Sequence, residues 1–348
     1  MNALVAGLNL AGINAKKSET KLPKLVLQIL IGPLMPLWYK LCGFQVIHIH
    51  WIAGQFRPNR LNGSTSRQFF YVLYKLFFKM CTLVNLKVVW TAHNLVPHEA
   101  VFTDDLAARQ LLVRHASRVI ALNQEISNSL VEAFHPKEVS LIPAAEPGVD
   151  ISVNREKSRG ELNLPDSQMY FCALGHIRPY KGPDIFLRAL LDLGSESRFS
   201  LVGSTNDDLF REEITELSRQ VAKSGTQLEL KIKFLSELEF SQHLLASDFL
   251  VCPFRQISNS GIVNMAMESG IPLILPDLPS LNWVPREVAI WYDHNSSETA
   301  LRQAISEAEK LSLSEREAMS LAGREFMKNR GWHHYISEHA RVYRELVG

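Results

Sequence analysis

One turn in the later half of the chain combines two cations with two glycines. It reads G-H-I-R-P-Y-K-G over residues 175–182, after an apolar run and before a helical pattern. Arg178 and Lys181 can reach the same anion, and charge-assisted bonds to an anion are among the stronger polar contacts of proteins. Gly175 and Gly182 let the backbone approach a ligand closely. The turn therefore predicts a site for an anionic group.

A second turn, C-P-F-R-Q-I-S-N-S-G over residues 252–261, ends an apolar run and opens a helix over 262–269. Its serines and asparagine are good N-cap residues. The free N–H groups and positive end of such a helix attract anions. Taken together, the two turns predict a diphosphate held by Arg178, Lys181, Gly182, Ser258, Asn259, Ser260 and Gly261.

The first half of the chain gathers titratable side chains near two predicted strand ends. His48 and His50 share one face of the strand over 44–50, since side chains alternate with period two. The next strand ends at His93, followed by His98 and Glu99. No H-E-x-x-H pattern occurs, so the group favours acid–base or sugar-contact roles and no metal site is expected.

Such side chains can act as a general base that takes the proton of a reacting hydroxyl group. We expect Glu99 or His93 to be that base, with His50 beside them. Asp104 and Asp105 are also candidates, although their position favours capping of the following helix.

Strand patterns alternate with helical patterns along the chain, which predicts parallel sheets with right-handed crossovers. Helices are expected at 104–116, 184–193, 207–223 and 298–310. The predicted strands are 44–50, 87–93, 118–123, 139–143, 170–176, 198–203, 228–234, 248–253, 272–275 and 288–292. Ligands of such sheets bind beyond the carboxyl ends of the strands, where both turns lie.

The length of 348 residues suggests two domains. Residues 143–159 lack periodicity and predict a linker. We therefore expect one domain over 1–150, a second over 151–330, and a last helix over 331–348. The net charge of +1 gives no indication of nucleic-acid binding. The four cysteines form no C-x-x-C pair, which suits a reducing cytosol.

Residues 66–80, S-R-Q-F-F-Y-V-L-Y-K-L-F-F-K-M, form a basic amphipathic helix with a wide aromatic arc. It either packs within its domain or docks on an anionic bilayer through Arg67, Phe69, Phe70, Lys75, Phe77 and Phe78. Neither a secretory leader nor a membrane span is evident. The expected location is the cytoplasm, on the inner face of the cell membrane.

The turn over 175–182 resembles the G-x-[IL]-R-x-Y-K-G turn of GT-B glycosyltransferases. Residues 258–272, S-N-S-G-I-V-N-M-A-M-E-S-G-I-P, resemble their donor-binding helix and the loop after it. The H-x-H-W and T-x-H-N-x-x-P-H-E patterns are similar to transferases of bacterial exopolysaccharide and capsule assembly. The resemblance implies an α/β fold of two Rossmann-like domains, with the acceptor-binding domain over 1–150 and the nucleotide-sugar-binding domain over 151–330. It also implies an interdomain cleft and a last helix that returns to the first domain.

One departure from the family pattern concerns stereochemistry. Common retaining GT-B families carry two glutamates eight residues apart. In this chain the corresponding positions are occupied by Ile257 and Met265. Glu268, one turn after Met265, could partly substitute. This departure from the retaining pattern favours a reaction that inverts the configuration at the anomeric carbon of the donor sugar.

Within the group, the chain is most similar to the β-mannosyltransferases that complete xanthan-type repeat units. The resemblance implies GDP-mannose as donor, a polyprenyl-diphosphate-linked oligosaccharide as acceptor, and no cofactor or metal requirement. Two alternatives stay open at this point. They are a nucleotide-sugar 2-epimerase and a catalytically silent subunit that binds a glycan or a partner.

Overall fold

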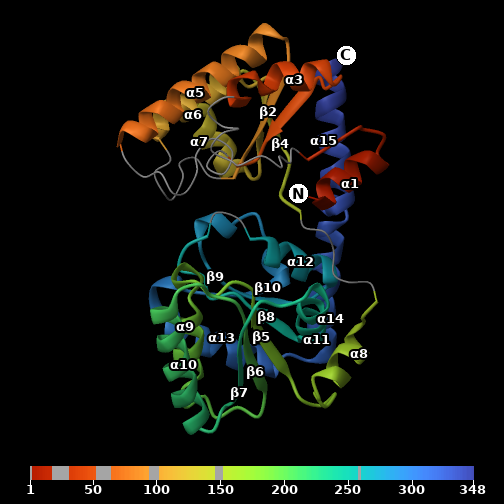
Figure 1. Ribbon diagram of the computed structural model, residues 1–348. Coiled ribbons are helices and arrows are strands. Elements are labelled where there is room, and N and C mark those ends of the chain that lie inside the picture. The colour runs from red at the N-terminus through yellow and green to blue at the C-terminus, as the bar shows by residue number, and fades with distance from the viewer. Residues whose placement is uncertain (1, 18–30, 52–63, 94–101, 146–151, 258–259) are drawn as a thin grey trace. The chain divides into compact units, whose positions relative to one another are not determined.

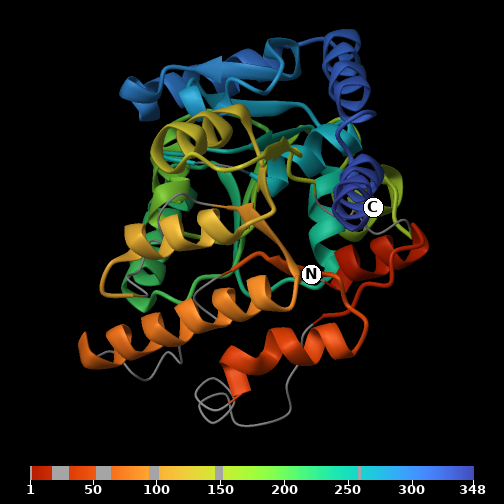
Figure 2. The ribbon, with the colours of Figure 1, turned by 90° about the horizontal axis from the view of Figure 1, so that it is seen from above.

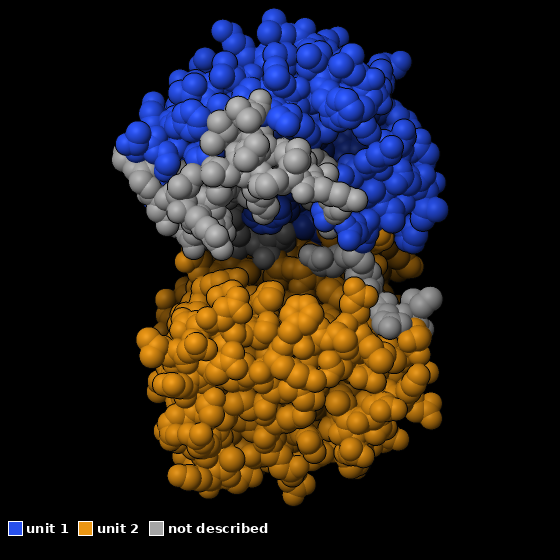
Figure 3. All heavy atoms as spheres, in the orientation of Figure 1, with its two compact units in different colours: residues 1–144, 333–348 blue, residues 145–332 orange. Residues whose placement is uncertain are grey.

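The computed structural model describes residues 2–17, 31–51, 64–93, 102–145, 152–257 and 260–348. Two compact units make up the chain (Figure 3). Unit 1 comprises residues 1–144 and 333–348, and unit 2 comprises residues 145–332. The final helix therefore belongs to unit 1, although its position in the sequence alone does not require this.

Unit 1 is built on a parallel sheet in the order β1-β2-β3-β4 (Figure 1). Its strands are β1 Val46–Ile49, β2 Lys87–Ala92, β3 Arg118–Ala121 and β4 Val139–Leu141. Its helices are α1 Asn2–Leu10, η2 Gly32–Leu34, α3 Met35–Leu41, α5 Ser64–Leu83, α6 Asp105–His115, α7 Gln124–Phe134 and α15 Trp332–Val347.

The two faces of this sheet have different partners. Helices α5, α6 and α7 bury one face, with Trp90 and Val88 of β2 in their shared core. On the other face, His48 of β1 contacts Tyr343 of α15. Helices α15 and α1 lie side by side (Figures 1 and 2), since a Cβ on Gly7 would lie 2.6 Å from Ile336 Cδ1.

Unit 2 contains a parallel sheet in the order β10-β9-β8-β5-β6-β7. Its strands are β5 Tyr170–Leu174, β6 Arg198–Gly203, β7 Gln227–Ile232, β8 Phe249–Val251, β9 Leu273–Pro276 and β10 Ala289–Tyr292. Its helices are α8 Arg155–Glu161, η3 Pro179–Lys181, α9 Pro183–Leu190, α10 Asp208–Lys223, α11 Glu237–Ala246, α12 Gly261–Ser269, η4 Pro279–Leu281, η5 Arg286–Val288, η6 His294–Ser296, α13 Ser297–Lys310 and α14 Leu313–Met327.

Helices cover both faces of the second sheet. Helices α9, α10 and α13 bury one face, and α11, α12 and α14 cover the other (Figure 1). Every strand predicted from the sequence overlaps a strand of the structure. The prediction of an α/β fold with two parallel sheets is confirmed.

The predicted linker extends too far. Helix α8 begins at Arg155, inside the predicted linker of 143–159, and Asn154 caps it by accepting a hydrogen bond from Lys157 N at 2.9 Å. The sequence of this segment shows no helical repeat of apolar residues, because α8 is short and is held in place by polar contacts. The prediction of an irregular segment as far as 159 is therefore wrong.

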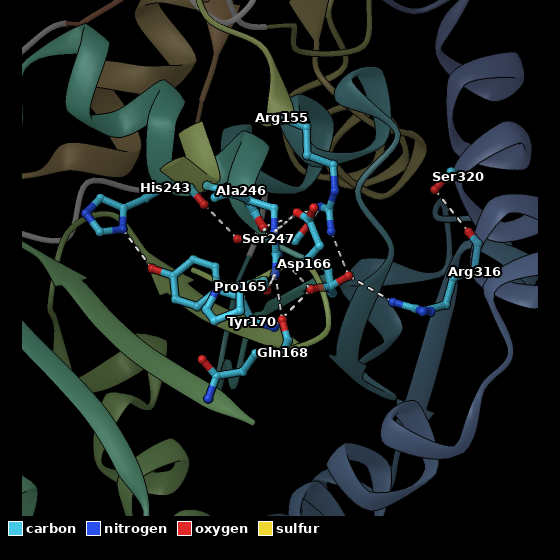
Figure 4. A network of polar contacts seen from close by, with 12 residues as sticks. Arg155, Pro165, Asp166, Gln168, Tyr170, His243, Ala246, Ser247, Arg316 and Ser320 are labelled. Carbon is cyan, nitrogen blue, oxygen red and sulfur yellow. Dashed lines mark hydrogen bonds and ion pairs between the residues drawn. The ribbon is translucent and has the colours of Figure 1, made fainter. Parts of the chain in front are cut away.

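The polar contacts that hold α8 centre on a buried carboxylate (Figure 4). Asp248, just before β8, accepts hydrogen bonds from Arg155, Arg159 and Arg316 at 2.8, 3.1 and 2.8 Å. Its Oδ2 also accepts Tyr170 N, at the first residue of β5. This network ties α8 and α14 to the amino ends of β5 and β8, at the edge of the sheet opposite the one where ligands of such folds bind.

Candidate functional site

The strand order of unit 2 reverses between β5 and β8. These neighbours pair through Phe171–Phe249 and Cys172–Leu250, while the chain leaves β5 towards β6 and leaves β8 towards β9. Such a reversal is the usual place for a ligand in an open parallel sheet, because the two following loops diverge there. The loops that follow these two strands are the cationic turn over 175–182 and the turn over 252–261.

The two turns are in direct contact. The backbone N–H of Arg255 donates to Tyr180 O at 2.9 Å. Gly182 has a φ of 66°, and a Cβ on it would lie 1.9 Å from Pro253 O. Only glycine combines this backbone conformation with so close an approach, so Gly182 sets the packing of one turn on the other.

Arg255 holds the two turns together with its side chain as well. Its guanidinium donates to Pro179 O at 2.8 Å and forms a two-fold contact with the Asp184 carboxylate at the start of α9. Burial works to raise the pKa of Asp184, but hydrogen bonding to Arg255 outweighs it and the pKa is lowered. Arg255 was not among the predicted site residues, because nothing in its sequence context distinguishes a positioning arginine from a ligand-binding one.

Arg178 and Lys181 are half-buried and lie in the same turn. Burial lowers the pKa of Lys181, and the positive charge of Arg178 adds to the effect. Lys181 Nζ is 3.7 Å from where a Cβ on Gly175 would lie, so the ammonium sits over the end of β5. Among the described residues, no carboxylate pairs with either cation. Two like charges held together without a counter-ion favour an anionic ligand.

A cavity of about 480 Å³ adjoins this turn, at the carboxyl ends of β5, β6 and β7. Its volume is in the range of small-molecule sites. Its lining residues are His176, Arg178, Ser204, Thr205, Asn206, Arg211, Ile232, Lys233 and Phe234. Of these, only Arg178 was predicted as a site residue. The signal that could have identified most of the others was their place at or just after the carboxyl ends of predicted strands; Arg211, inside the predicted helix over 207–223, gave no such signal.

The predicted residues around α12 are placed unequally. Ser260 is buried at the N-cap, and Gly261 begins the helix. Ser258 and Asn259 lie outside the described residues. Glu268 is seven residues further along, about 10 Å of helix from Gly261, and its carboxylate lies beside Gly331, between α14 and α15. The fold thus brings Ser260 and Gly261 to the turns, and places Glu268 at the other end of α12.

His48, His50 and His93 form one cluster on the sheet face of unit 1 that carries α15. His48 Nε2 lies 2.8 Å from Thr91 Oγ1, and its Nδ1 bonds the hydroxyl of Tyr343. His50 Nδ1 lies 3.4 Å from His93 Nε2. The rings of His48 and His50 are 4.1 Å apart, which follows from their shared strand face.

Burial keeps this cluster uncharged. It lowers the pKa of His50 to about 3 and that of His93 to about 4, and it also lowers the pKa of His48. A neutral imidazole can accept a proton, so His93 has the protonation state of a general base at neutral pH. Glu99, the other predicted base, lies outside the described residues. Asp104 caps α6 as expected, accepting Ala107 N at 2.9 Å.

Helix α5 corrects three of the predicted membrane-docking residues. Phe70, Phe77 and Phe78 have exposed fractions of 1%, 5% and 0%, so in this fold they cannot touch a bilayer. They pack into the core of unit 1 because aromatic side chains occupy most of the circumference of α5. The larger share of that aromatic surface lies against the sheet. Phe69 is 43% exposed, Lys75 is exposed and Arg67 is half-buried. Among the described helices, none is long and apolar enough to cross a membrane.

Comparison with known proteins agrees with this geometry. Residues 168–309 match the family described as "Glycosyl transferases group 1". The matched region contains β5 to β10, the two turns and the cavity.

Similar proteins extend the match along the chain. The GDP-mannose:glycolipid 4-beta-D-mannosyltransferase of Xanthomonas campestris pv. campestris is 24% identical over 315 residues, covering 88% of this chain and 81% of that protein. The sucrose-phosphate synthase of Thermosynechococcus elongatus has a TM-score of 0.70 at 17% identity, covering 94% of this chain and 81% of its own. Anabaena Alr3699/HepE in complex with UDP has a TM-score of 0.70 at 14% identity, covering 94% of this chain and 86% of that protein. The fold is therefore GT-B.

Proposed function

Because this chain is a glycosyltransferase with a group 1 domain over residues 168–309, we propose that it transfers mannose from GDP-mannose to a lipid-linked oligosaccharide. The acceptor is a polyprenyl-diphosphate-linked sugar of exopolysaccharide assembly, and the product is a β-linkage formed with inversion. The observation that carries the proposal is the contact between the cationic turn and the turn before α12. The similar Xanthomonas protein, named for a GDP-mannose donor and a glycolipid acceptor, supports the choice of substrates.

The reaction needs a stabilised leaving group and a base. The acceptor hydroxyl oxygen bonds to the anomeric carbon while the bond from that carbon to the diphosphate oxygen breaks. Arg178 and Lys181 stabilise the negative charge that develops on the departing GDP. This arrangement supplies positive charge without a metal ion, so transfer is expected to continue in EDTA. The hydroxyl proton passes to His93 or to Glu99.

The acceptor's lipid would hold the enzyme at a membrane surface. Three helices of unit 1 that pack together expose apolar side chains, namely Leu34, Leu37, Trp38 and Leu41 from η2 and α3, and Phe69, Val72, Leu76 and Leu83 from α5. Lys75 and Lys79 are exposed on the same α5. Apolar side chains beside lysines suit the interface of an anionic bilayer. This docking surface replaces the one predicted from the buried phenylalanines.

Vesicle binding tests the docking surface. The double variant Leu76→Ser, Leu83→Ser is expected to bind phosphatidylglycerol vesicles at least about ten-fold more weakly than the unmodified protein. The control is Leu106→Ser on α6, because Leu106 is 57% exposed but belongs to none of the three helices of the surface. Equal binding by all three proteins would leave the surface without a membrane role.

Product analysis tests the transfer itself. The protein is incubated with GDP-mannose, GDP-glucose, UDP-glucose or UDP-galactose and a membrane extract that contains lipid-linked oligosaccharides. NMR of the released glycan is expected to show a new β-mannosyl residue with GDP-mannose alone. A product with another donor would replace the donor assignment, and an α-linkage would exclude inversion.

A further inference from the structure

Strand β7 is the last strand of the sheet of unit 2, and among the described residues no strand pairs with its outer side. The N–H of Lys233, just after β7, donates to Gly203 O of β6 at 2.7 Å. Because backbone groups alternate in direction along a strand, Glu229 and Lys231 also direct theirs to β6. The residues between them direct their N–H and C=O groups away from the sheet, where they are open to another strand. These outward residues are Leu228, Leu230 and Ile232.

The side chains of β7 are divided between the two faces of the sheet. The three apolar ones are half-buried against the core that α9, α10 and α13 share. The two charged ones lie on the face that α11 covers, where Lys231 Nζ is 3.3 Å from Glu229 Oε1 and 3.4 Å from His243 Nε2. The side chains of Lys231 and Glu229 are 30% and 29% exposed, so both can be reached from beyond the edge.

Charged residues commonly protect an exposed sheet edge, because they repel most other edges. The charges of β7 do not protect it from a second copy of itself. Glu229 and Lys231 lie on either side of Leu230, so an antiparallel copy centred on Leu230 sets each charge opposite its counter-charge. The same register sets Leu230 opposite Leu230 and Leu228 opposite Ile232. A shift of two residues in either direction would instead set Glu229 against Glu229 or Lys231 against Lys231.

The backbone favours the same register. Each outward residue of one copy meets an outward residue of the other, and such a pair exchanges two hydrogen bonds. Glu229 and Lys231 then occupy the pairs without hydrogen bonds, in which side chains approach most closely. A strand of six residues is about 20 Å long. A contact of this length belongs with the small, reversible interfaces.

We propose that two copies of this chain associate through β7, antiparallel and centred on Leu230, so that one sheet continues across both copies. The interface is isologous, since the same residues serve on both sides of a two-fold axis. The dimer is weak and depends on protein concentration. In this register Lys233, which lines the cavity of one copy, lies opposite Gln227 of the second copy, which therefore reaches the rim of that cavity.

Sedimentation velocity at increasing protein concentration tests the association. The unmodified protein is expected to show a reversible equilibrium between monomer and dimer. Glu229→Lys and Lys231→Glu each replace two attractive cross-strand contacts by two repulsive ones, and each is expected to raise the Kd of the dimer about ten-fold. A protein that stays monomeric throughout, or charge variants that dimerise as the unmodified protein does, would overturn the proposal.

Mixing the two single variants distinguishes a contact between copies from an effect within each chain. An equimolar mixture again sets opposite charges across the edge, so the Kd of the mixed dimer is expected to return to that of the unmodified protein. The double variant Glu229→Lys, Lys231→Glu is expected to dimerise normally for the same reason. A mixture that associates as poorly as its components would show that the charges act only within the fold, which rejects the interface.

Two controls exclude other surfaces. Glu325→Lys reverses one member of an exposed ion pair on α14, and it is expected to leave the dimer unchanged. The variant Leu76→Ser, Leu83→Ser removes apolar side chains from the docking surface of unit 1, and it is also expected to dimerise normally. Loss of the dimer in either control would place the contact elsewhere and overturn the assignment to β7.

Amide hydrogen exchange tests the register without any substitution, and so decides the matter even if a charge variant fails to fold. The outward N–H groups of Leu228, Leu230 and Ile232 are expected to exchange more slowly as the protein concentration rises. The N–H groups of Glu229 and Lys231, already bonded to β6, are expected to show no such change. Exchange of the outward groups that does not depend on concentration, in a sample that dimerises, would contradict pairing through this edge.

Discussion

Replacement of Lys181 by methionine should change nucleotide binding and protein stability in opposite directions. The Lys181 ammonium is half-buried beside Arg178, and no described carboxylate pairs with it. Methionine keeps the length of the side chain and removes a charge that the fold does not compensate. The folded protein should therefore gain about 1 kcal/mol, which corresponds to about 2–4 °C in Tm for a unit of this size.

Nucleotide affinity should fall in the same variant. One charge-assisted hydrogen bond to a phosphate contributes about 1.5–3 kcal/mol, or about 10- to 150-fold in Kd. GDP at a hundred times its Kd should stabilise the unmodified protein by about 2.7 kcal/mol. With a Kd about 30-fold weaker, the same GDP concentration would stabilise Lys181→Met by only about 0.9 kcal/mol.

Thermal unfolding with and without GDP measures both effects in one experiment. The control is Lys223→Met, because Lys223 is exposed in the last turn of α10 within the same unit. That control should change neither Tm nor the GDP shift appreciably. If Lys181→Met lowers Tm, or keeps the full GDP shift, then Lys181 serves the fold rather than the anion and the assignment of the pocket is wrong.

Four further predictions each concern a single residue. Asp248→Asn should lower the free energy of unfolding by about 3–5 kcal/mol in a denaturant titration, because it leaves buried guanidinium groups without a counter-charge; a loss below about 1 kcal/mol would contradict that reading. If neutral His93 is the base, kcat/KM should hold its value on acidification until about pH 4, and a decline centred near 6.5 would point to another group. His50 has a folded pKa of about 3, below its unfolded value of 6.5, so its contribution to stability is present above pH 6.5 and should be lost as the pH falls towards 3. Gly182→Ala should abolish the GDP thermal shift, because the new Cβ would lie 1.9 Å from Pro253 O at a φ of 66°; an unchanged shift would show that the turns can separate without loss of the site.

The sequence alone predicted the strands and singled out the cationic turn over 175–182, but it missed helix α8 and most of the residues that line the cavity. Short apolar runs rich in β-branched and aromatic residues, such as 198–203 and 87–92, can form only buried strands between helical patterns, so their positions were predictable from local chemistry. Gly182 and Lys181 could be singled out as candidates, because glycines and cations on one strand-to-helix turn suit the close approach of an anion. Capping residues such as Asp104 were predictable for the same reason, since a helix N-terminus needs an acceptor close in sequence.

Contacts between distant segments could not be read from the sequence, because each depends on which strands become neighbours. The pairing of β5 with β8 brings Arg255 to Asp184, although 71 residues separate them. Helix α5 is aromatic around most of its surface, and only the position of the sheet decided that Phe78 faces inward while Leu76 faces out. The histidines acquired their low pKa values in the same way. Burial shifts the pKa of a side chain through everything packed around it, and for His48 this includes a helix from the far end of the chain. Local sequence thus determined which residues could do chemistry, and tertiary packing decided which of them share a site and in what charge state.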